Sequence, residues 1–140
     1  MRCTRHRRAW LRRAAATVEL AVLAPFLAFL FVAVVDYSRI FYHSLTVANC
    51  ARNGALYASD PVAATESPYK SIQDAALADA GDLSPTPTVT STSGTDDSGN
   101  PYVEVTVTHA FQTVVNYPGI PETTTITRTV RMRVSPTVPN

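Results

Sequence analysis

A long apolar segment near the start of the chain limits the possible folds more than any other sequence feature. Residues 14–35 contain a single charged residue, Glu19. As a helix this segment is roughly 33 Å long, which is enough to cross a bilayer. It is also longer than the apolar part of a cleaved secretory signal, which usually has about 7 to 15 residues. We therefore predict a transmembrane helix over residues 14–35.

The distribution of charge predicts how this helix is oriented. Half of the twelve Lys and Arg residues precede it, as Arg2, Arg5, Arg7, Arg8, Arg12 and Arg13. Such a head could serve as a nucleic-acid-binding or lipid-binding arm, but beside an apolar segment the positive-inside rule gives a simpler interpretation. From residue 36 onward six basic residues face ten acidic ones, a net charge of −4, which argues against nucleic acid as a partner. We expect a cytoplasmic head and an exported C-terminal part.

The helix is predicted to continue beyond the membrane as an amphipathic stalk over residues 36–60. Asp60 followed by Pro61 is expected to end it. Apolar residues recur at helical spacings as Tyr37, Phe41, Leu45, Ala48 and Ala55. Polar residues fall outside this stripe, namely Arg39, His43, Asn49 and Asn53. We predict that the stripe is chiefly an internal packing face rather than a docking surface.

The remaining residues, 61–140, are predicted to form a small extracytoplasmic α+β domain. Ser67 and Pro68 resemble the start of a short second helix that ends near Gly81. Apolar and polar residues alternate over 103–111 and 126–134, which indicates half-buried strands, and residues 88–92 form a weaker third candidate. Residues 94–101 and 117–121 are expected to be turns. We predict an antiparallel sheet of three or four strands with the long helix across its apolar face.

Few residues suggest chemistry. The acidic turn at 96–100 could bind calcium, but it lacks the EF-hand spacing and is better explained as a hairpin loop. His6, His43 and His109 show no metal-binding or catalytic spacing, and no phosphate-binding glycine loop is present. We therefore expect no enzymatic activity, no metal, no cofactor and no small-molecule substrate.

Cys50 and Arg128 each have more than one interpretation. Cys3 and Cys50 are expected on opposite sides of the membrane, so Cys50 could cross-link two subunits or, as we prefer, pack as a small apolar residue. Arg128 interrupts the apolar face of the last strand. It could pair with an acid such as Glu104, reach the sheet edge or contact another subunit, and we prefer a locally satisfied charge.

The N-terminal residues resemble a known family. Residues 12–25 read RRAAATVELAVLAP, and residues 36–41, after the apolar stretch, read DYSRIF. A basic pair, small residues, Val-Glu, an apolar run with Leu-x-Pro and then Asp-x-x-Arg are similar to the start of TadE-like proteins, over about residues 12–55. The resemblance implies a pilin-like fold and a structural, non-enzymatic role as a pseudopilin or minor pilin of a tight-adherence (Tad, or Flp) pilus. In such folds the lower half of the apolar stripe on the stalk packs between subunits, and the upper half packs on the chain's own sheet.

The resemblance also implies a processing site. A prepilin peptidase would cut between Ala14 and Ala15, at a position where the family usually has glycine before the cut, and Glu19 would become the fifth residue of the mature chain. The Glu19 carboxylate could then pair with the N-terminal ammonium of a neighbouring subunit and set the axial register between subunits.

Other roles follow from the same resemblance. Pro25 would kink the helix, and Asp36 with Arg39 would mark its exit from the membrane. The expected partners are the membrane, other pilin-like subunits, the peptidase and the Tad secretion platform. The alternative is a single-pass anchored binding module unrelated to pili, for which the N-terminus stays uncut and Glu19 is unimportant.

Overall fold

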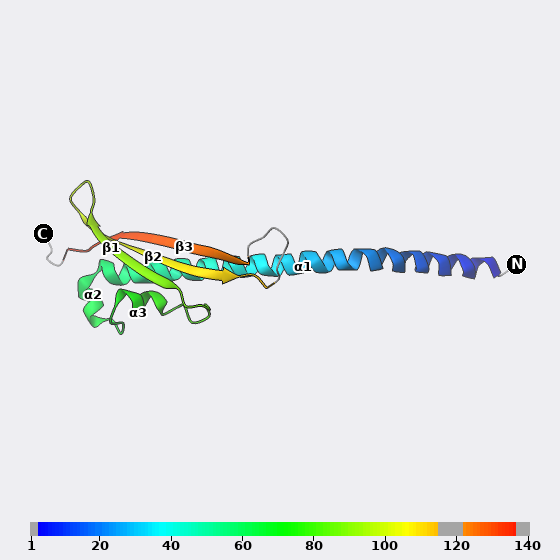
Figure 1. Ribbon diagram of the computed structural model, residues 1–140, viewed down its shortest axis with the longest axis horizontal. Helices are drawn as coiled ribbons and strands as arrows, with labels where there is room; N and C mark the ends of the chain where they lie inside the picture. Colours follow the sequence, from blue (N-terminus) through cyan, green and yellow to red (C-terminus); the bar gives the residue numbers. More distant parts are fainter. Residues whose placement is uncertain (1–2, 115–121, 137–140) are drawn as a thin grey trace. The chain divides into compact units, whose positions relative to one another are not determined.

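The computed structural model describes residues 3–114 and 122–136, with side chains from residue 15 onward. Its elements are three helices and three strands: α1 (Cys3–Ser59), α2 (Pro61–Glu66), α3 (Ile72–Leu77), β1 (Thr88–Thr95), β2 (Pro101–Gln112) and β3 (Thr123–Arg133). The chain divides into two units, Met1–Ser38 and Arg39–Asn140, and α1 contributes to both. The predicted α+β class is confirmed, with a long N-terminal helix packed on an antiparallel sheet (Figure 1).

The first unit consists of the N-terminal part of α1. Its alanines, leucines and other helix-compatible residues favour one continuous helix. Pro25 lies inside that helix, a position that membrane helices tolerate. From Ala15 to Val35 the side chains are exposed or only half-buried. In the described part of the chain, α1 is the one helix long and apolar enough to cross a membrane.

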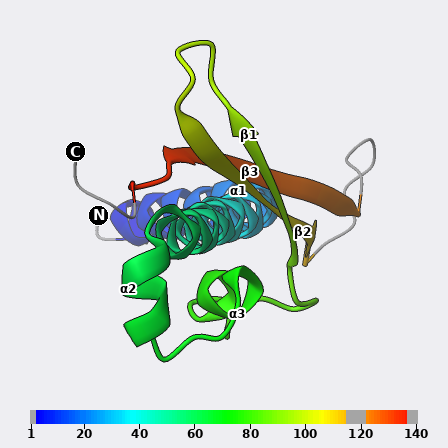
Figure 2. The same cartoon turned by 90° about the vertical axis from the view of Figure 1, so that its left-hand side faces the viewer.

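The sheet of the second unit has the order β1-β2-β3, and both pairings are antiparallel. Its central strand, β2, alternates strictly between buried and half-buried positions from Tyr102 to Phe111. The register places Ser91 and Val130 on either side of Val105. The alternation therefore gives the sheet one apolar face, as predicted, and the C-terminal part of α1 packs on it (Figure 2).

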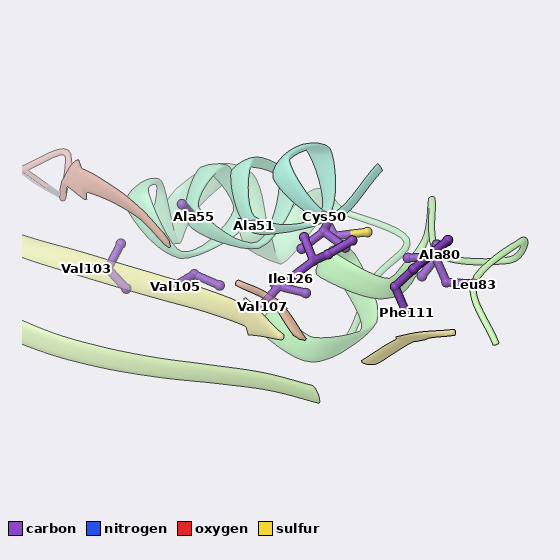
Figure 3. Close-up of a cluster of buried hydrophobic side chains, with 11 residues drawn as sticks. Cys50, Ala51, Ala55, Ala80, Leu83, Val103, Val105, Val107, Phe111 and Ile126 are labelled. Atoms are coloured by element: carbon purple, nitrogen blue, oxygen red, sulfur yellow. The ribbon is translucent and has the colours of Figure 1, made fainter. Parts of the chain in front are cut away.

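The core lies between this part of α1, the sheet and α3 (Figure 3). Small residues on α1 let the helix backbone come close to the strand. At Gly54 an added Cβ would stand 3.0 Å from Ala76 Cβ and 3.1 Å from Val105 Cγ1. Larger side chains fill the space around this contact, each contributing about 1.5–3 kcal/mol by burial. The core residues are Val47, Cys50, Ala51, Ala55, Ala80, Leu83, Val103, Val105, Val107, Phe111 and Ile126.

Internal packing of the predicted stripe is found only in its upper half. Tyr37, Phe41 and Leu45 are 74%, 61% and 51% exposed, Ala48 is half-buried, and only Ala55 is fully buried. The buried face is instead rotated around the helix and contains Val47, Cys50, Ala51 and Gly54, with His43 half-buried below them. Small side chains permit the closest approach of the helix to the sheet. The face that packs on the sheet therefore carries small residues, whereas the large apolar residues of the lower stalk are exposed.

The second helix is also different from the prediction. Asp60 ends α1 but also begins α2, because its carboxylate accepts hydrogen bonds from the amides of Val62 and Ala63 at 3.1 and 3.0 Å. Ser67 is the C-terminal cap of α2 rather than the N-terminal cap of a later helix. The next helix, α3, is short and starts after Ser71, whose hydroxyl accepts from the amide of Asp74.

The turn at 96–100 is a hairpin loop between β1 and β2, as preferred from the sequence. Asp96 accepts hydrogen bonds from the amides of Ser98 and Asn100 at 3.0 and 2.8 Å, and Gly99 supplies the positive φ of 78°. The Asp96 carboxylate also lies 3.0 Å from the guanidinium of Arg133. The Asn100 amide, above all, holds the pKa of Asp96 below its usual value. The other predicted turn, 117–121, lies outside the described residues.

Candidate assembly surface

The apolar side chains of the first unit form a surface that the unit does not cover by itself. Val22, Phe26 and Phe31 are more than half exposed. Val22 and Phe26 share one face of the helix, and Phe31 lies on the opposite side. Moving one such side chain from water into an apolar environment is favourable by about 1.5–3 kcal/mol. A helix that is apolar all round is stable only in lipid or among other apolar helices. The segment is therefore consistent with a single membrane span.

The predicted processing site lies within this unit. The backbone of α1 is helical through Ala14 and Ala15 and begins at Cys3. The side chain of Glu19 is exposed. Ala15 and Glu19 are four residues apart, so they share one face of the helix. A carboxylate on that face could contact a charged group of a second helix.

Asp36 and Arg39, the two residues of the predicted membrane-exit motif, lie in different units and different surroundings. Asp36 belongs to the first unit and its side chain is buried. Arg39 belongs to the second unit, where its Cζ atom lies 5.2 Å from the centroid of the Phe111 ring. Such a distance is typical of a cation–π contact. The contact attaches the start of the stalk to the end of β2, which spacing in the sequence could not reveal because the residues are far apart in the chain.

The lower stalk presents apolar residues to the outside of the second unit. Phe41 and Leu45 are one turn apart and both are more than half exposed. Near them, the hydroxyl of Tyr42 donates to Asp82 at 3.2 Å. The exposed pair gives this unit an apolar face that is available to a second molecule.

Arg128 binds within its own chain, as preferred from the sequence, but its partners are not the predicted ones. Its guanidinium donates to the Ser44 hydroxyl on α1 and to the Thr127 carbonyl at 3.1 Å. Arg128 thus links the edge strand β3 to the stalk.

Two histidines that the sequence separates by 66 positions meet in the second unit. Nδ1 of His43 on α1 lies 3.2 Å from Nε2 of His109 on β2. His109 is buried, and its Nδ1 lies 3.0 Å from the Pro85 carbonyl oxygen. Burial, and then the charges of His109 and Arg39, lower the pKa of His43. The sequence did not indicate that these two histidines form a pair, because their contact depends on how the helix and the strand are aligned.

A groove of about 330 Å³ lies in the second unit beside the C-terminal end of α1. It is lined by the last turns of α1 together with α2 and α3, including Leu56, Tyr57 and Tyr69. The Tyr57 hydroxyl donates to the Tyr69 carbonyl at 3.3 Å, and the Asn53 amide donates to Asp79 at 2.7 Å. These polar groups of the lining are therefore already bonded to one another. The groove was not predicted from the sequence, because part of its lining belongs to α2, a helix that was not predicted.

Cys50 is fully buried in the core, which agrees with the packing role preferred from the sequence. Burial, with a smaller contribution from Asp79, raises the pKa of its thiol. A buried thiol of raised pKa reacts slowly with other thiols.

Among the described residues, no group of three or more His, Cys, Asp or Glu side chains is placed to hold a metal ion.

Comparison with known proteins agrees with the resemblance seen in the sequence. Residues 14–56 match the family described as TadE-like protein. The match covers the apolar segment and most of the stalk, including Glu19, Pro25, Asp36 and Arg39. No curated protein and no solved structure matches the chain.

Proposed function

We propose that this chain is a TadE-like pseudopilin or minor pilin that contributes to the assembly of an adhesive Tad (Flp) pilus. The observation that carries the proposal is the TadE-like match over residues 14–56, together with an apolar helix packed on a small antiparallel sheet. In this proposal the role is structural rather than enzymatic. The immediate partners are other pilin-like subunits, a prepilin peptidase and the secretion platform.

The proposed location is the inner membrane, which α1 crosses once. Residues 1–13 form the basic cytoplasmic leader, 14–35 the membrane segment, 36–60 the stalk and 61–140 the extracytoplasmic domain. The arginine-rich head and the acidic remainder support this orientation through the positive-inside rule. The exposed apolar surface of the first unit supports membrane insertion.

Processing is the first step of the proposed pathway. The peptidase cuts between Ala14 and Ala15 and leaves a free ammonium group at the new N-terminus. Glu19 of one subunit then pairs with the ammonium of its neighbour, and the pairing offsets the cost of holding either charge in an apolar environment. Because only one axial position satisfies the pair, Glu19 sets the register between subunits.

Lateral packing of subunits continues along the stalk. Phe41 and Leu45 on the lower stalk are exposed in the single chain and would be buried between neighbouring helices in an assembly. This agrees with a stalk whose upper part packs on its own sheet while its lower part packs on other subunits.

The proposal is tested by complementing a strain that lacks the gene with wild type or Glu19→Ala. We expect both proteins to insert into the membrane in similar amounts, while only wild type restores surface pili. Glu66→Ala removes an exposed acid from the end of α2 and serves as the matched control. Normal piliation with Glu19→Ala would contradict the assigned role of Glu19.

A second candidate function is supported by the groove between α1, α2 and α3. An aromatic-lined hollow of about 330 Å³ is within the size range of small-ligand sites. An anchored binding module would use it and would need neither processing nor Glu19. Tyr57→Ala would then abolish ligand binding in the groove. The pilin proposal instead expects piliation to survive this change if the protein still folds.

A further inference from the structure

The contact between the stalk and the sheet contains a directed chain of hydrogen bonds. A carbonyl oxygen only accepts, so the Nδ1 of His109, which lies 3.0 Å from the Pro85 oxygen, must carry a proton. In a neutral imidazole the other nitrogen is then an acceptor. Nε2 of His109 therefore accepts from Nδ1 of His43 at 3.2 Å. The chain runs from the stalk through the central strand to the loop before β1.

The surroundings of this pair are apolar and cationic. The Phe111 ring stands edge-on to His43, with centroids 5.0 Å apart and an interplanar angle of 88°. Arg39 lies over the same Phe111 ring from the stalk. From β3, Arg128 reaches Ser44, the residue next to His43. From the loop after α3, Asp82 contributes a carboxylate, but Tyr42 already donates to it. These groups favour neutral imidazoles over imidazolium ions.

We propose that His43 and His109 form a proton-sensitive latch that holds the stalk on the sheet at neutral pH and weakens that contact in mild acid. The first proton added to the pair leaves one N–H between the two rings, so it keeps the hydrogen bond but places a cation beside the buried His109 and near Arg39. A second proton puts an N–H on both Nδ1 of His43 and Nε2 of His109, and these groups oppose each other across 3.2 Å and end the hydrogen bond. Both events disfavour the docked state, and they concern the fold itself, so the latch stands independently of the pilus proposal.

The pair is assigned to protons rather than to a metal ion for two reasons. Structural metal sites in proteins usually take four ligands, and the described residues around this pair supply two. The nearby guanidinium of Arg39 would repel a divalent cation.

The sign of the pH effect follows from the direction of the shift. The pKa of His43 is lowered in the folded protein, so the unfolded chain binds more protons as the pH falls below the ordinary histidine range. The contribution of the latch is therefore complete above about pH 7.5 and is lost as the pH falls through the range around pH 6. Exposed carboxylates titrate at lower pH, which separates their effect from that of the latch.

The test uses the full chain in detergent micelles, with chemical unfolding followed by circular dichroism between pH 5.0 and 7.5. We expect the folding equilibrium constant of wild type to fall about tenfold over this range. In His43→Asn, the amide nitrogen occupies the place of Nδ1 and can still donate to His109 without titrating. The combination His43→Asn with His109→Gln should lose most of the pH dependence, to about threefold or less.

A measurement on wild type alone decides the matter if the variants fold poorly. Imidazole Cε1–H resonances report each titration, and His6 in the basic head serves as the reference. The latch predicts that His43 titrates at a lower pH than His6. Equal titration of His43 and His6, or an unchanged pH dependence in the double variant, would overturn the proposal.

Discussion

Gly54 on α1 and Val105 on β2 are so close that a Cβ at position 54 would lie 3.1 Å from Val105 Cγ1. Ala76 on α3 would be equally close, at 3.0 Å. The absence of a side chain at this position allows helix, strand and short helix to meet at one point. The packing of the second unit therefore depends on the small size of this residue.

This contact predicts that a larger residue at position 54 destabilises the domain. Leucine is a good helix former, so Gly54→Leu should cost about 2–3 kcal/mol through overpacking alone. Chemical unfolding of the full chain in micelles measures the change. Gly81→Ala is the matched control, because an added Cβ there meets no atom within 4 Å and should change stability by less than about 0.5 kcal/mol. Equal stability of the two variants would contradict the packing described.

Two phenylalanines test the rotation of the stalk. Phe111 is buried in the core and Phe41 is exposed. Phe111→Ala should lower the free energy of unfolding by about 3–5 kcal/mol, whereas Phe41→Ala should change it by less than about 0.5 kcal/mol. The same unfolding assay compares them. If subunits pack through the lower stalk, Phe41→Ala should instead reduce the number of surface pili. A large loss of stability in Phe41→Ala would show that Phe41 packs in the core and would contradict the rotation of the stalk described above.

The β1–β2 hairpin predicts a second, more acidic pH dependence. The pKa of Asp96 is lowered by its bond from the Asn100 amide, with smaller contributions that include Arg133. A lowered acid pKa contributes stability that is present above the unfolded value near pH 4 and is lost as the pH falls through the folded value. The protection of the backbone amides of residues 96–100 against hydrogen exchange, relative to the rate of an unstructured chain at the same pH, should therefore fall below about pH 4 in wild type. The loss of protection should be weaker in Asp96→Asn, and an identical profile in both proteins would exclude this role.

Glu19 predicts a separation of insertion from assembly that depends on charge. Glu19→Gln keeps the size of the side chain but loses the negative charge, so we expect normal membrane insertion and strongly reduced assembly. Glu19→Asp keeps the charge on a shorter side chain and should retain part of the activity. Membrane fractionation and counts of surface pili measure the two effects. Full assembly with Glu19→Gln would show that the charge is not needed.

The features predicted correctly from the sequence have short-range causes. Strict alternation over 103–111 determined the central strand, and hydropathy located the long helix. The hairpin at 96–100 followed from turn-forming residues. In each of these cases neighbouring residues carry the whole signal.

The features missed depend on contacts between distant residues. The stalk packs through Cys50, Ala51 and Gly54, whose small size makes them uninformative in a hydropathy pattern but allows close approach to the sheet. The His43–His109 contact needs the rotation of the helix and the register of the strand together. The helix α2 was missed because Asp60 both ends one helix and caps the next.

The most direct test of the pilin-like assignment is the N-terminal residue and intact mass of the protein purified from membranes, with and without its prepilin peptidase. Our account predicts a chain that starts at Ala15 when the peptidase is present and keeps residues 1–14 when it is absent. An intact basic head in both samples would contradict processing and favour an ordinary membrane-anchored binding module.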